Sequence, residues 1–406
     1  MGKNHGRVYN HTVRRSEANE QTLIELLAAV YPHTSREGWL EHIREDRVTV
    51  TLRGAPCDAA TPLDSLRVVD GMQIAYHRPP WVEPMTPLAE LRTLHDDGTL
   101  VVLHKPSGLP VLPSELYYEN TVVSALGQRA TDSGWSQVPH PAHRLGVGTS
   151  GLLLCGIGAA ARSALSKAFE ARTITKTYRA LVTGVISASA QRQRSASRKR
   201  ERSEATEEAP GASSGADGTF EIACPIGPVP HSSWTGSVHG AAPSGGDKAK
   251  HALSVVRVLE SDANANTTLV EVRIPTGRPH QIRIHMAYCG HPLVGDPLYV
   301  VGGVPKDAST HCAEFGRHES RPPLPRDAGY LLHAWRATLP HPASGELVTF
   351  TAPCPPELCT RVELQDVQQM ARTEGDVPAE CEGPGPCTRR GTAHVERGHE
   401  ERREES

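Results

Sequence analysis

Short apolar runs that end at turn residues recur along most of this chain, and they constrain its fold more than any other feature. Continuous apolar stretches of this length are typical of buried strands. One intervening segment, 159–170, instead places Ala161, Leu165 and Phe169 at helical spacing. We therefore predict an α+β domain with more strand than helix. Its expected strands lie at 99–103, 152–155, 178–182, 255–259 and 269–274, with a further strand around Phe350.

A smaller unit is expected ahead of this domain, at residues 20–80. Its sequence predicts two helices followed by strands, and Ser35 is a plausible N-cap for the second helix. The last strand ends before Pro79-Pro80, because proline cannot continue a hydrogen-bonded ladder. Residues 1–19 remain as an N-terminal arm. The expected elements are helices at 22–30 and 35–44 and strands at 47–53 and 72–77.

Two segments have compositions that cannot bury a core. Residues 187–218 are rich in Arg, Ser, Glu, Ala and Gly, and residues 375–406 form a similar polar tail. Both compositions predict disorder. A protein–protein scaffold that uses these two segments is one hypothesis for function, although no obligate protein partner is evident from the sequence.

Composition narrows the class of protein. The net charge of −3 over 406 residues is not that of a uniformly basic nucleic-acid binder, but it is compatible with a basic cleft. No run of 18 apolar residues occurs, and the polar N-terminus lacks the apolar core of a secretory signal. We therefore expect no membrane association and a location in the cytoplasm or nucleus. The basic, acid-poor first 15 residues leave an organelle open.

The nine cysteines indicate reduced thiols. They contain no Cys-x-x-Cys pair, and the Cys354/Cys359 and Cys381/Cys387 spacings do not match common zinc motifs. We therefore expect no metal site.

The densest group of chemically useful side chains lies at residues 276–285, Thr-Gly-Arg-Pro-His-Gln-Ile-Arg-Ile-His, directly after an expected strand. Arginine forks bind phosphate or carboxylate through two hydrogen bonds, and Gln or His can contact a base edge. This composition favours recognition of a nucleic acid or another anion over a plain solvated loop.

A second stretch, His-Arg-Leu-Gly-Val-Gly-Thr-Ser-Gly-Leu-Leu-Leu at residues 143–154, contains the spacing of a dinucleotide-binding fingerprint. That fingerprint requires a strand before the glycines and a helix after them. Here a Pro/His loop precedes the glycines and the apolar strand follows, so we reject a nucleotide cofactor. Scattered Ser, His and Asp residues do not by themselves make a catalytic triad, which leaves a serine hydrolase without support.

Residues 143–154 resemble the signature His-Arg-Leu-Asp-x-x-Thr-Ser-Gly-Leu-Leu-Leu of RluA-type RNA pseudouridine synthases. Further blocks resemble the family's motifs and fall in the family's order, so that the similarity extends over 96–358, interrupted by 187–218. These blocks lie at 101–108, 176–184, 276–285 and 290–299, with a weaker match at 332–334, 341–342 and 350.

The resemblance implies a mixed, mostly antiparallel sheet with flanking helices, an RNA partner, and neither cofactor nor metal. Residues 20–80 resemble the small ribosomal-protein-like RNA-binding module that often precedes this domain, although its second helix carries few basic residues, chiefly Arg36 and Arg44. The family isomerises uridine to pseudouridine: the base is flipped out of the RNA, cut from the ribose, turned and rejoined through carbon 5.

Site residues carry over by position. Arg144 would fill the gap left by the flipped uridine, Tyr178 would stack under the uracil, and Arg283 would pair with the catalytic carboxylate. The remaining expected RNA or uridine contacts are Lys105, His143, Thr149, Ser150, Arg278, His280 and Gln281.

The family's catalytic aspartate is Gly146 in this chain. Glycine has no side chain and cannot do the carboxylate's work. Three interpretations follow: an RNA-binding relative without activity, an enzyme with a carboxylate from elsewhere such as Asp132 or Asp296, or an enzyme in which another group carries the step. The sequence favours an RNA-modifying enzyme because the tyrosine and both arginines remain.

Overall fold

The computed structural model divides the chain into two compact units, Met1–Pro84 and Met85–Ser406. The disorder predicted for 187–218 and 375–406 falls outside the described residues, apart from the short strand β19 (Glu396–Arg397). No described helix is long and apolar enough to span a membrane. The structure describes residues 3–18, 20–31, 34–57, 62–114, 116–130, 132–186, 219–229, 238–246, 248–306, 324, 326–366 and 396–397.

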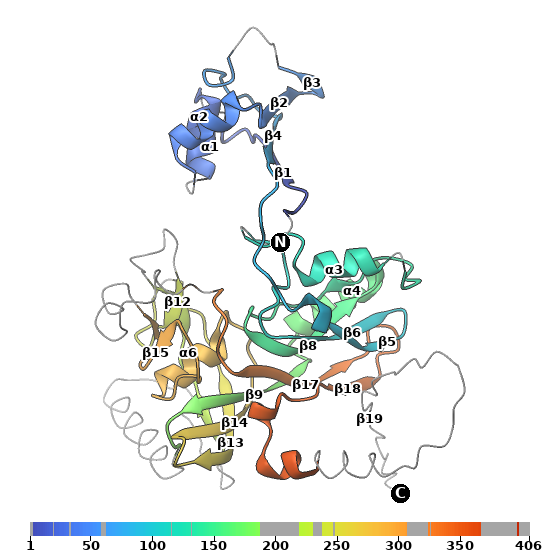
Figure 1. Cartoon of the computed structure of the whole chain (residues 1–406), viewed down its shortest axis with the longest axis vertical. Helices are drawn as coiled ribbons and strands as arrows, with labels where there is room; N and C mark the ends of the chain where they lie inside the picture. Colours follow the sequence, from blue (N-terminus) through green and yellow to red (C-terminus); the bar gives the residue numbers. More distant parts are fainter. Residues whose placement is uncertain are drawn as a thin grey trace, which may run out of the picture. The chain divides into compact units, whose positions relative to one another are not determined.

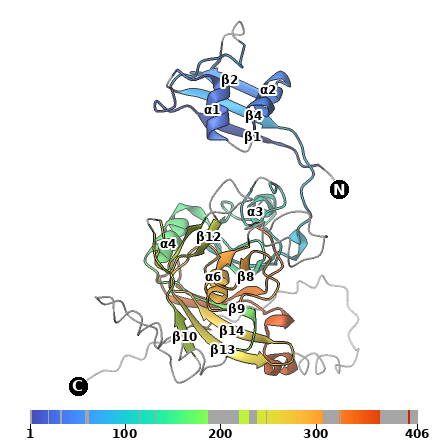
Figure 2. The ribbon, with the colours of Figure 1, turned by 90° about the vertical axis from the view of Figure 1, so that its left-hand side faces the viewer.

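The N-terminal unit packs two helices on a four-stranded sheet of order β1-β4-β2-β3 (Figures 1 and 2). Ser35 caps α2 as expected, accepting a hydrogen bond from the Gly38 amide at 3.1 Å. The two helices bury Leu23, Leu27 and Trp39 in a core of their own. The elements are β1 (Arg7–Thr12), α1 (Leu23–Val30), α2 (Arg36–Arg44), β2 (Val48–Leu52), β3 (Ala55–Pro56) and β4 (Met72–Arg78).

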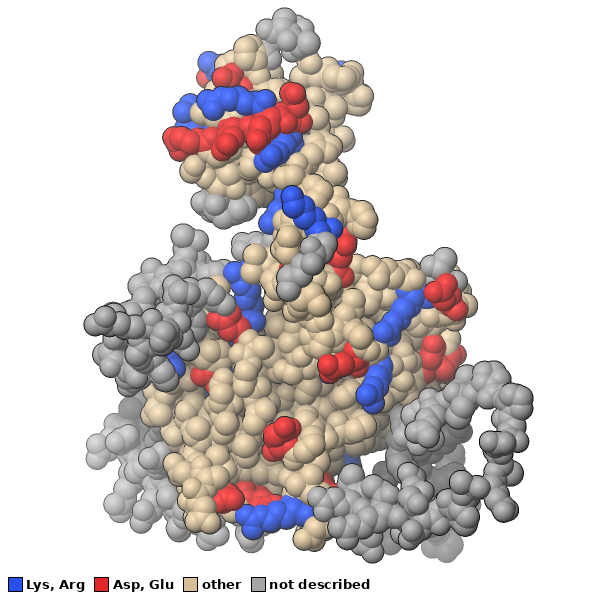
Figure 3. Space-filling view, in the orientation of Figure 1, with Lys and Arg blue, Asp and Glu red and all other residues tan. Residues whose placement is uncertain are grey.

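The charges on the helical side of this unit are mixed. Helix α2 carries Arg36 and Arg44 together with Glu37 and Glu41. Figure 3 shows basic and acidic side chains interleaved on this face. The face therefore lacks the uniform positive charge that would mark a strong phosphate-binding surface.

The larger unit is built on an 11-stranded sheet that is mixed and mostly antiparallel, as predicted. Its main path has the order β10-β13-β14-β9-β17-β8-β6-β5, in which β17 and β8 are parallel and the other neighbours are antiparallel. These strands are β5 (Arg92–Asp96), β6 (Leu100–Lys105), β8 (Thr149–Gly156), β9 (Thr175–Thr183), β10 (Thr219–Ile222), β13 (Ser254–Asp262), β14 (Thr267–Arg273) and β17 (Leu332–Pro340).

Short strands and helices complete the unit. Helix α4 packs against β8, whereas α6 packs against β12, β13, β15 and β16 (Figure 1). The helices are η1 (Leu88–Glu90), α3 (Val122–Arg129), α4 (Gly158–Glu170), α6 (Gln281–Tyr288) and η2 (Pro356–Leu358). The remaining strands are β7 (His140–Pro141), β11 (Ile226–Val229), β12 (Val238–Ala241), β15 (Tyr299–Val300), β16 (Val304–Pro305) and β18 (Leu347–Thr351).

Burial explains why the central strands read as continuous apolar runs. Every residue of β8 is buried, and Val101, Val102 and Leu103 of β6 are completely inaccessible. A strand covered on both faces needs apolar side chains at successive positions rather than at alternate ones. The predicted strands and the helix at 159–170 are therefore confirmed, with shifts of a few residues at their ends.

Helix α6 was not predicted. The segment 276–285 was assigned no secondary structure, but its second half begins this helix, whose residues Gln281–Ala287 are all buried. A helix enclosed on every side has no polar face, so it lacks the amphipathic period that reveals a surface helix.

Candidate active site

The centre of the large sheet gathers segments that are distant in the sequence. Loop 143–148 leads into β8, Tyr178 lies on β9, and Tyr330 lies two residues before β17. These three strands are neighbours in the sheet. The parallel register pairs Leu332 with Thr149, so the segments preceding β17 and β8 meet at the same end.

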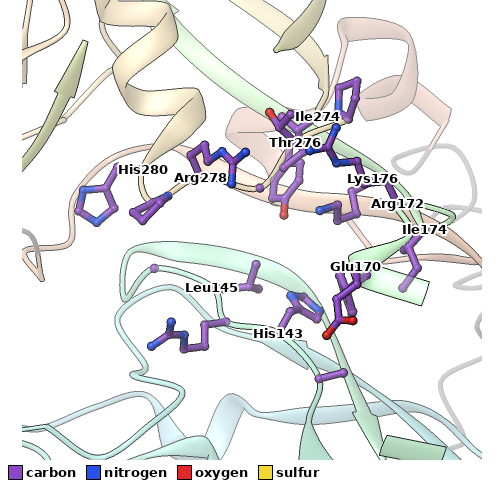
Figure 4. A pocket seen from close by; sticks show the side chains of 18 residues that line it. His143, Leu145, Glu170, Arg172, Ile174, Lys176, Ile274, Thr276, Arg278 and His280 are labelled. Carbon is purple, nitrogen blue, oxygen red and sulfur yellow. The ribbon is translucent and has the colours of Figure 1, made fainter. Parts of the chain in front are cut away.

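A pocket of about 850 Å³ opens at this end. Its lining includes four basic side chains, Arg144, Arg172, Lys176 and Arg278, and one carboxylate, Glu170. Figure 4 shows Lys176 and Arg278 on one side of the pocket and His143 and Leu145 on the other. Four cations against one anion suit a polyanionic ligand.

A smaller cavity of about 90 Å³, here called the inner cavity, shares part of this lining. It adds Thr149, Arg283 and Tyr330 to Tyr178 and Gly146. The described residues that line it include no carboxylate. The inner cavity therefore offers hydroxyls and guanidinium groups as its reactive side chains.

Arg283 is anchored by an acid on its far side. Its Nε and Nη2 each donate to Asp296 at 2.7 Å, and the two side chains are 2% and 1% exposed. Burial alone would lower the pKa of Arg283, but the Asp296 carboxylate raises it overall. The third nitrogen, Nη1, is buried with no hydrogen-bond partner among the described atoms. A permanently charged group with a spare donor therefore stands in the inner cavity.

Tyr330 fills the space beside Gly146. A Cβ added to Gly146 would lie 2.6 Å from the Tyr330 hydroxyl oxygen, and one added to Gly148 would lie 2.8 Å from Cε1 of the same ring. Tyr330 is 3% exposed, its hydroxyl lies 3.3 Å from Thr149 Oγ1, and its ring centroid lies 4.1 Å from Arg283 Cζ. The two glycines that suggested a nucleotide fingerprint thus make room for a tyrosine ring.

Two of the predicted contact residues hydrogen-bond to nearby backbone, and of these two His143 also lines the pocket. Lys105 is completely buried, and its Nζ donates to the carbonyls of Pro106, Leu109 and Val147 at 2.8–3.1 Å. His143 Nε2 accepts from the Leu154 amide at 3.0 Å, and burial lowers the pKa of His143 to about 3. The neutral histidine and the lysine amino group held by three carbonyls therefore help to shape loop 143–148.

Other predicted contacts are also used internally. Ser150 Oγ lies 2.8 Å from His333 Nδ1. Gln281 Nε2 donates to Leu253 O at 2.7 Å, and His280 Nδ1 lies 2.8 Å from the Tyr299 hydroxyl. These bonds fix the 276–285 block and the start of β8, so the geometry supports positioning roles for these three side chains.

Arg144, Tyr178 and Arg278 do face the cavities. Arg144 is exposed, whereas Tyr178 is 8% exposed, and burial raises the pKa of its phenol to about 12. Arg278 Nε donates to the His251 carbonyl at 2.9 Å, which leaves its other nitrogens available to a ligand. The site therefore joins an exposed arginine, a buried aromatic platform and a second arginine around one opening.

Neither carboxylate that was considered as a substitute faces the cavity. Asp132 is exposed and lines neither pocket. Asp296 comes within reach of Arg283, but its Oδ1 also accepts the amides of Leu298 and Tyr299 at 2.9 and 3.0 Å. With its side chain enclosed and its acceptors occupied, Asp296 holds the arginine and does not open toward a nucleoside.

Tyr330 and Arg172 were missed by sequence reasoning. Arg172 follows an amphipathic helix, where a basic residue attracts no notice. Tyr330 stands 181 residues from Thr149, and only the pairing of β17 with β8 brings them together. The one available signal was the coincidence of a missing aspartate with a tyrosine two residues before an expected closing strand.

Two further features of the described residues concern metal binding and disulfide pairing. The described residues contain no group of three or more His, Cys, Asp or Glu side chains arranged to hold a metal ion. The six described cysteines are in no disulfide within the described part of the chain. Cys381 and Cys387 lie outside the described residues.

Comparison with known proteins identifies the family. The sequence model for RNA pseudouridylate synthase matches residues 99–288. The chain is 36% identical to RNA pseudouridine synthase 5 of Oryza sativa subsp. japonica, over 90% of this chain and 91% of the rice protein. It is 35% identical to RNA pseudouridine synthase 5 of Arabidopsis thaliana, over 89% and 96% of the two chains. Ribosomal large subunit pseudouridine synthase D of Nitrosomonas europaea is 29% identical over 89% and 93%. The chain belongs to the RNA pseudouridylate synthase family.

Proposed function

We propose that this protein converts uridine to pseudouridine in a structured RNA, without a cofactor or metal. The observation that carries the proposal is the basic pocket, where four cationic side chains line the wide part and Tyr178, Arg283 and Tyr330 line the adjoining inner cavity. A polyanion in the wide part and a planar base in the inner cavity match these two regions. Family membership supports the same reaction.

Each pocket residue has a proposed task. Arg172, Lys176 and Arg278 bind phosphates, because the guanidinium and ammonium groups line the wide part of the pocket. Arg144 enters the gap left by the flipped nucleotide, since it is exposed on the loop that leads to Gly146. Filling that gap offsets part of the few kcal/mol that extrusion of a base costs. Tyr178 supports the uracil ring by stacking.

The N-terminal unit is proposed to add RNA affinity. Its fold of two helices on a small sheet supports this role, but the mixed charge of α2 argues for a weak contribution. We place the activity in the cytoplasm or nucleus. An organelle remains the alternative because the first 15 residues are basic and acid-poor.

A second candidate function is RNA binding without turnover. The observation that favours it is Gly146, which leaves the inner cavity without a carboxylate. Loss of a central nucleophile usually removes most of the rate of an enzyme while binding survives.

Pseudouridine mapping separates the two functions. Total RNA from cells with and without the protein is mapped, and purified protein is then added to the RNA that lacks it. We expect at least one site to disappear and to be restored in vitro. Unchanged maps together with retained RNA binding would establish the binding protein instead.

The phosphate contacts have their own test in the same RNA. Lys176→Ala and Arg278→Ala should each weaken binding and reduce the slope of log K against log salt by about one. The exposed Arg162→Ala on α4 is the matched control, because Arg162 lines neither cavity. Equal slopes for all three variants would place the RNA elsewhere.

A further inference from the structure

The side chain of Tyr330 fills the space that a side chain on residue 146 would need. The phenol oxygen lies where a side chain on residue 146 would begin, 2.6 Å from the position of a Cβ. The φ of Gly146 lies outside the left-handed region, so its backbone could carry an ordinary side chain. It is therefore the volume of Tyr330, and not the conformation of the loop, that excludes the family's aspartate.

The surroundings of Tyr330 are those of a reactive group. Its hydroxyl opens on the cavity that also contains Gly146 and Tyr178. The Arg283 guanidinium lies over its ring at 4.1 Å from the centroid, with Nη1 lacking any hydrogen-bond partner among the described atoms. A buried cation with a spare donor stabilises negative charge that develops on a neighbouring oxygen.

The other hydroxyls of the inner cavity are less suited. Burial raises the pKa of Tyr178 to about 12, which disfavours its phenolate, and Thr149 bears an aliphatic hydroxyl that ionises far less readily than a phenol. Glu170 is the one described carboxylate in the wider pocket, but it is exposed and absent from the lining of the inner cavity.

We propose that the Tyr330 hydroxyl takes over the work of the missing aspartate and is the catalytic nucleophile of this synthase. The inference rests on the proposed function and extends it to the identity of the reacting group. Tyrosine serves as a nucleophile in other enzymes that cleave glycosidic bonds.

The step balances without a co-reactant. The phenol oxygen bonds to C1′ of the ribose as the C1′–N1 bond breaks, and the phenol proton passes to N1 of the departing uracil. After the base turns, C5 bonds to C1′ and the C1′–O bond breaks, which regenerates the phenolate. The phenolate then takes the proton from C5. One proton has left C5, one has arrived at N1, and the enzyme is restored.

The first test removes only the hydroxyl. The full-length protein is assayed at a mapped site in total RNA from cells that lack it, under single-turnover conditions. Tyr330→Phe should slow turnover by about 10³-fold or more while melting temperature and RNA affinity stay near those of the wild type. Tyr117→Phe is the matched control, because Tyr117 lines neither cavity. A Tyr330→Phe rate within about threefold of the wild type would overturn the proposal.

The second test exchanges the two groups. Gly146→Asp alone should lose the turnover of the wild type, because its Cβ meets the Tyr330 oxygen. In Gly146→Asp/Tyr330→Leu the ring is gone and the carboxylate has space beside Arg283 Nη1, so turnover should exceed that of Tyr330→Leu by at least about tenfold. A double variant no faster than Tyr330→Leu would refute the exchange of one group for the other.

Two outcomes distinguish this inference from the proposed function. A wild-type protein without turnover on any RNA overturns both. An active wild-type protein that loses turnover in Glu170→Gln but retains it in Tyr330→Phe overturns the role of Tyr330 alone and moves the reaction to the carboxylate.

Discussion

At the scale of single residues, the two glycines of loop 143–148 have a steric role, because they leave space for the ring of Tyr330. Gly146 and Gly148 are separated by one residue and both lie against the Tyr330 ring. Lys105, for which ligand binding was predicted, donates to the carbonyl of Val147 in this loop, and His143 accepts from the Leu154 amide of β8. These two polar side chains therefore act on the backbone of the loop and of the strand that follows it.

Gly148→Ala tests whether turnover depends on the close packing of the Tyr330 ring against loop 143–148. The new Cβ would lie 2.8 and 2.9 Å from two ring atoms of Tyr330 and 3.0 Å from Ala328 Cα, so the ring must move. Displacement of a reacting group by about 1 Å can cost on the order of 10²-fold in rate. We expect a loss of that size in single-turnover rate with RNA affinity unchanged.

Gly127→Ala is the control for that change. Gly127 is exposed in α3 and an added Cβ would meet nothing within 4 Å. Alanine should stabilise the helix by about 0.5–1 kcal/mol and leave the rate alone. If Gly148→Ala were as active as Gly127→Ala, the position of the Tyr330 ring would not matter for turnover.

At the scale of elements, two successive residues of β9 have different roles. Tyr178 belongs to the candidate site, and Arg179 stabilises the unit. Tyr178 faces the cavity, whereas Arg179 is 4% exposed and pairs with Glu363 through two hydrogen bonds. Arg179 Cζ also lies 4.1 Å from the Trp335 ring centroid. Alternation along the strand places these two side chains on opposite faces.

Glu363→Gln should loosen the segment that follows η2. The hydrogen bonds from Arg179 lower the pKa of Glu363 to about 2 from 4.5. The carboxylate therefore stabilises the fold above pH 4.5, and this contribution is lost as the pH falls toward 2. Because the side chain is 40% exposed, solvent screening limits the effect to about 1–2 kcal/mol at pH 7.

Urea unfolding at several pH values measures this contribution. The free energies of unfolding of the wild type and Glu363→Gln should differ at pH 7, and the gap should narrow as the pH falls from 4.5 toward 2. Glu357→Gln, which changes an exposed carboxylate of η2, should match the wild type throughout. A gap between the wild type and Glu363→Gln that was as wide at pH 3 as at pH 7 would mean that the ion pair is not its source.

Local patterns predicted the strands well because the central ones are apolar throughout and end at Gly, Pro or Asp. Helix α6 was not predicted, because a completely buried helix lacks the amphipathic period that marks a surface helix. Arg144, Tyr178 and Arg283 were placed by motif, and all three line the inner cavity. Tyr330 could not be placed, because its position depends on the parallel pairing of two strands whose separation in sequence carries no local signal.

At the scale of the whole chain, the larger unit contains a set of buried histidines that stay neutral. Burial lowers the pKa of His143 and His280 to about 3 and that of His285 and His333 to about 4. Their side chains bond to neighbouring elements: His285 lies 2.8 Å from Ser254 Oγ and 2.9 Å from Cys224 O. The polar interior of the unit thus depends on imidazoles that stay uncharged.

This set predicts a steep loss of stability in mild acid. In the unfolded chain these histidines take up protons below about pH 6.5, whereas in the fold they stay neutral to about pH 4. The unfolded state then binds more protons, so the free energy of unfolding falls as pH decreases from 6.5 to 4. At pH 5.5 each of these histidines should lower the free energy of unfolding by about 1.4 kcal/mol relative to its value at neutral pH.

The slope of the unfolding free energy against pH counts the protons taken up. Near pH 5 we expect His333→Gln to lower that count by about one, whatever its effect on stability at pH 7, because one buried imidazole is gone. His140→Asn, which removes an exposed histidine, is the matched control. A wild-type slope near zero between pH 6 and 5 would mean that these histidines protonate within the fold, and that the interior around β8 and β17 tolerates charge.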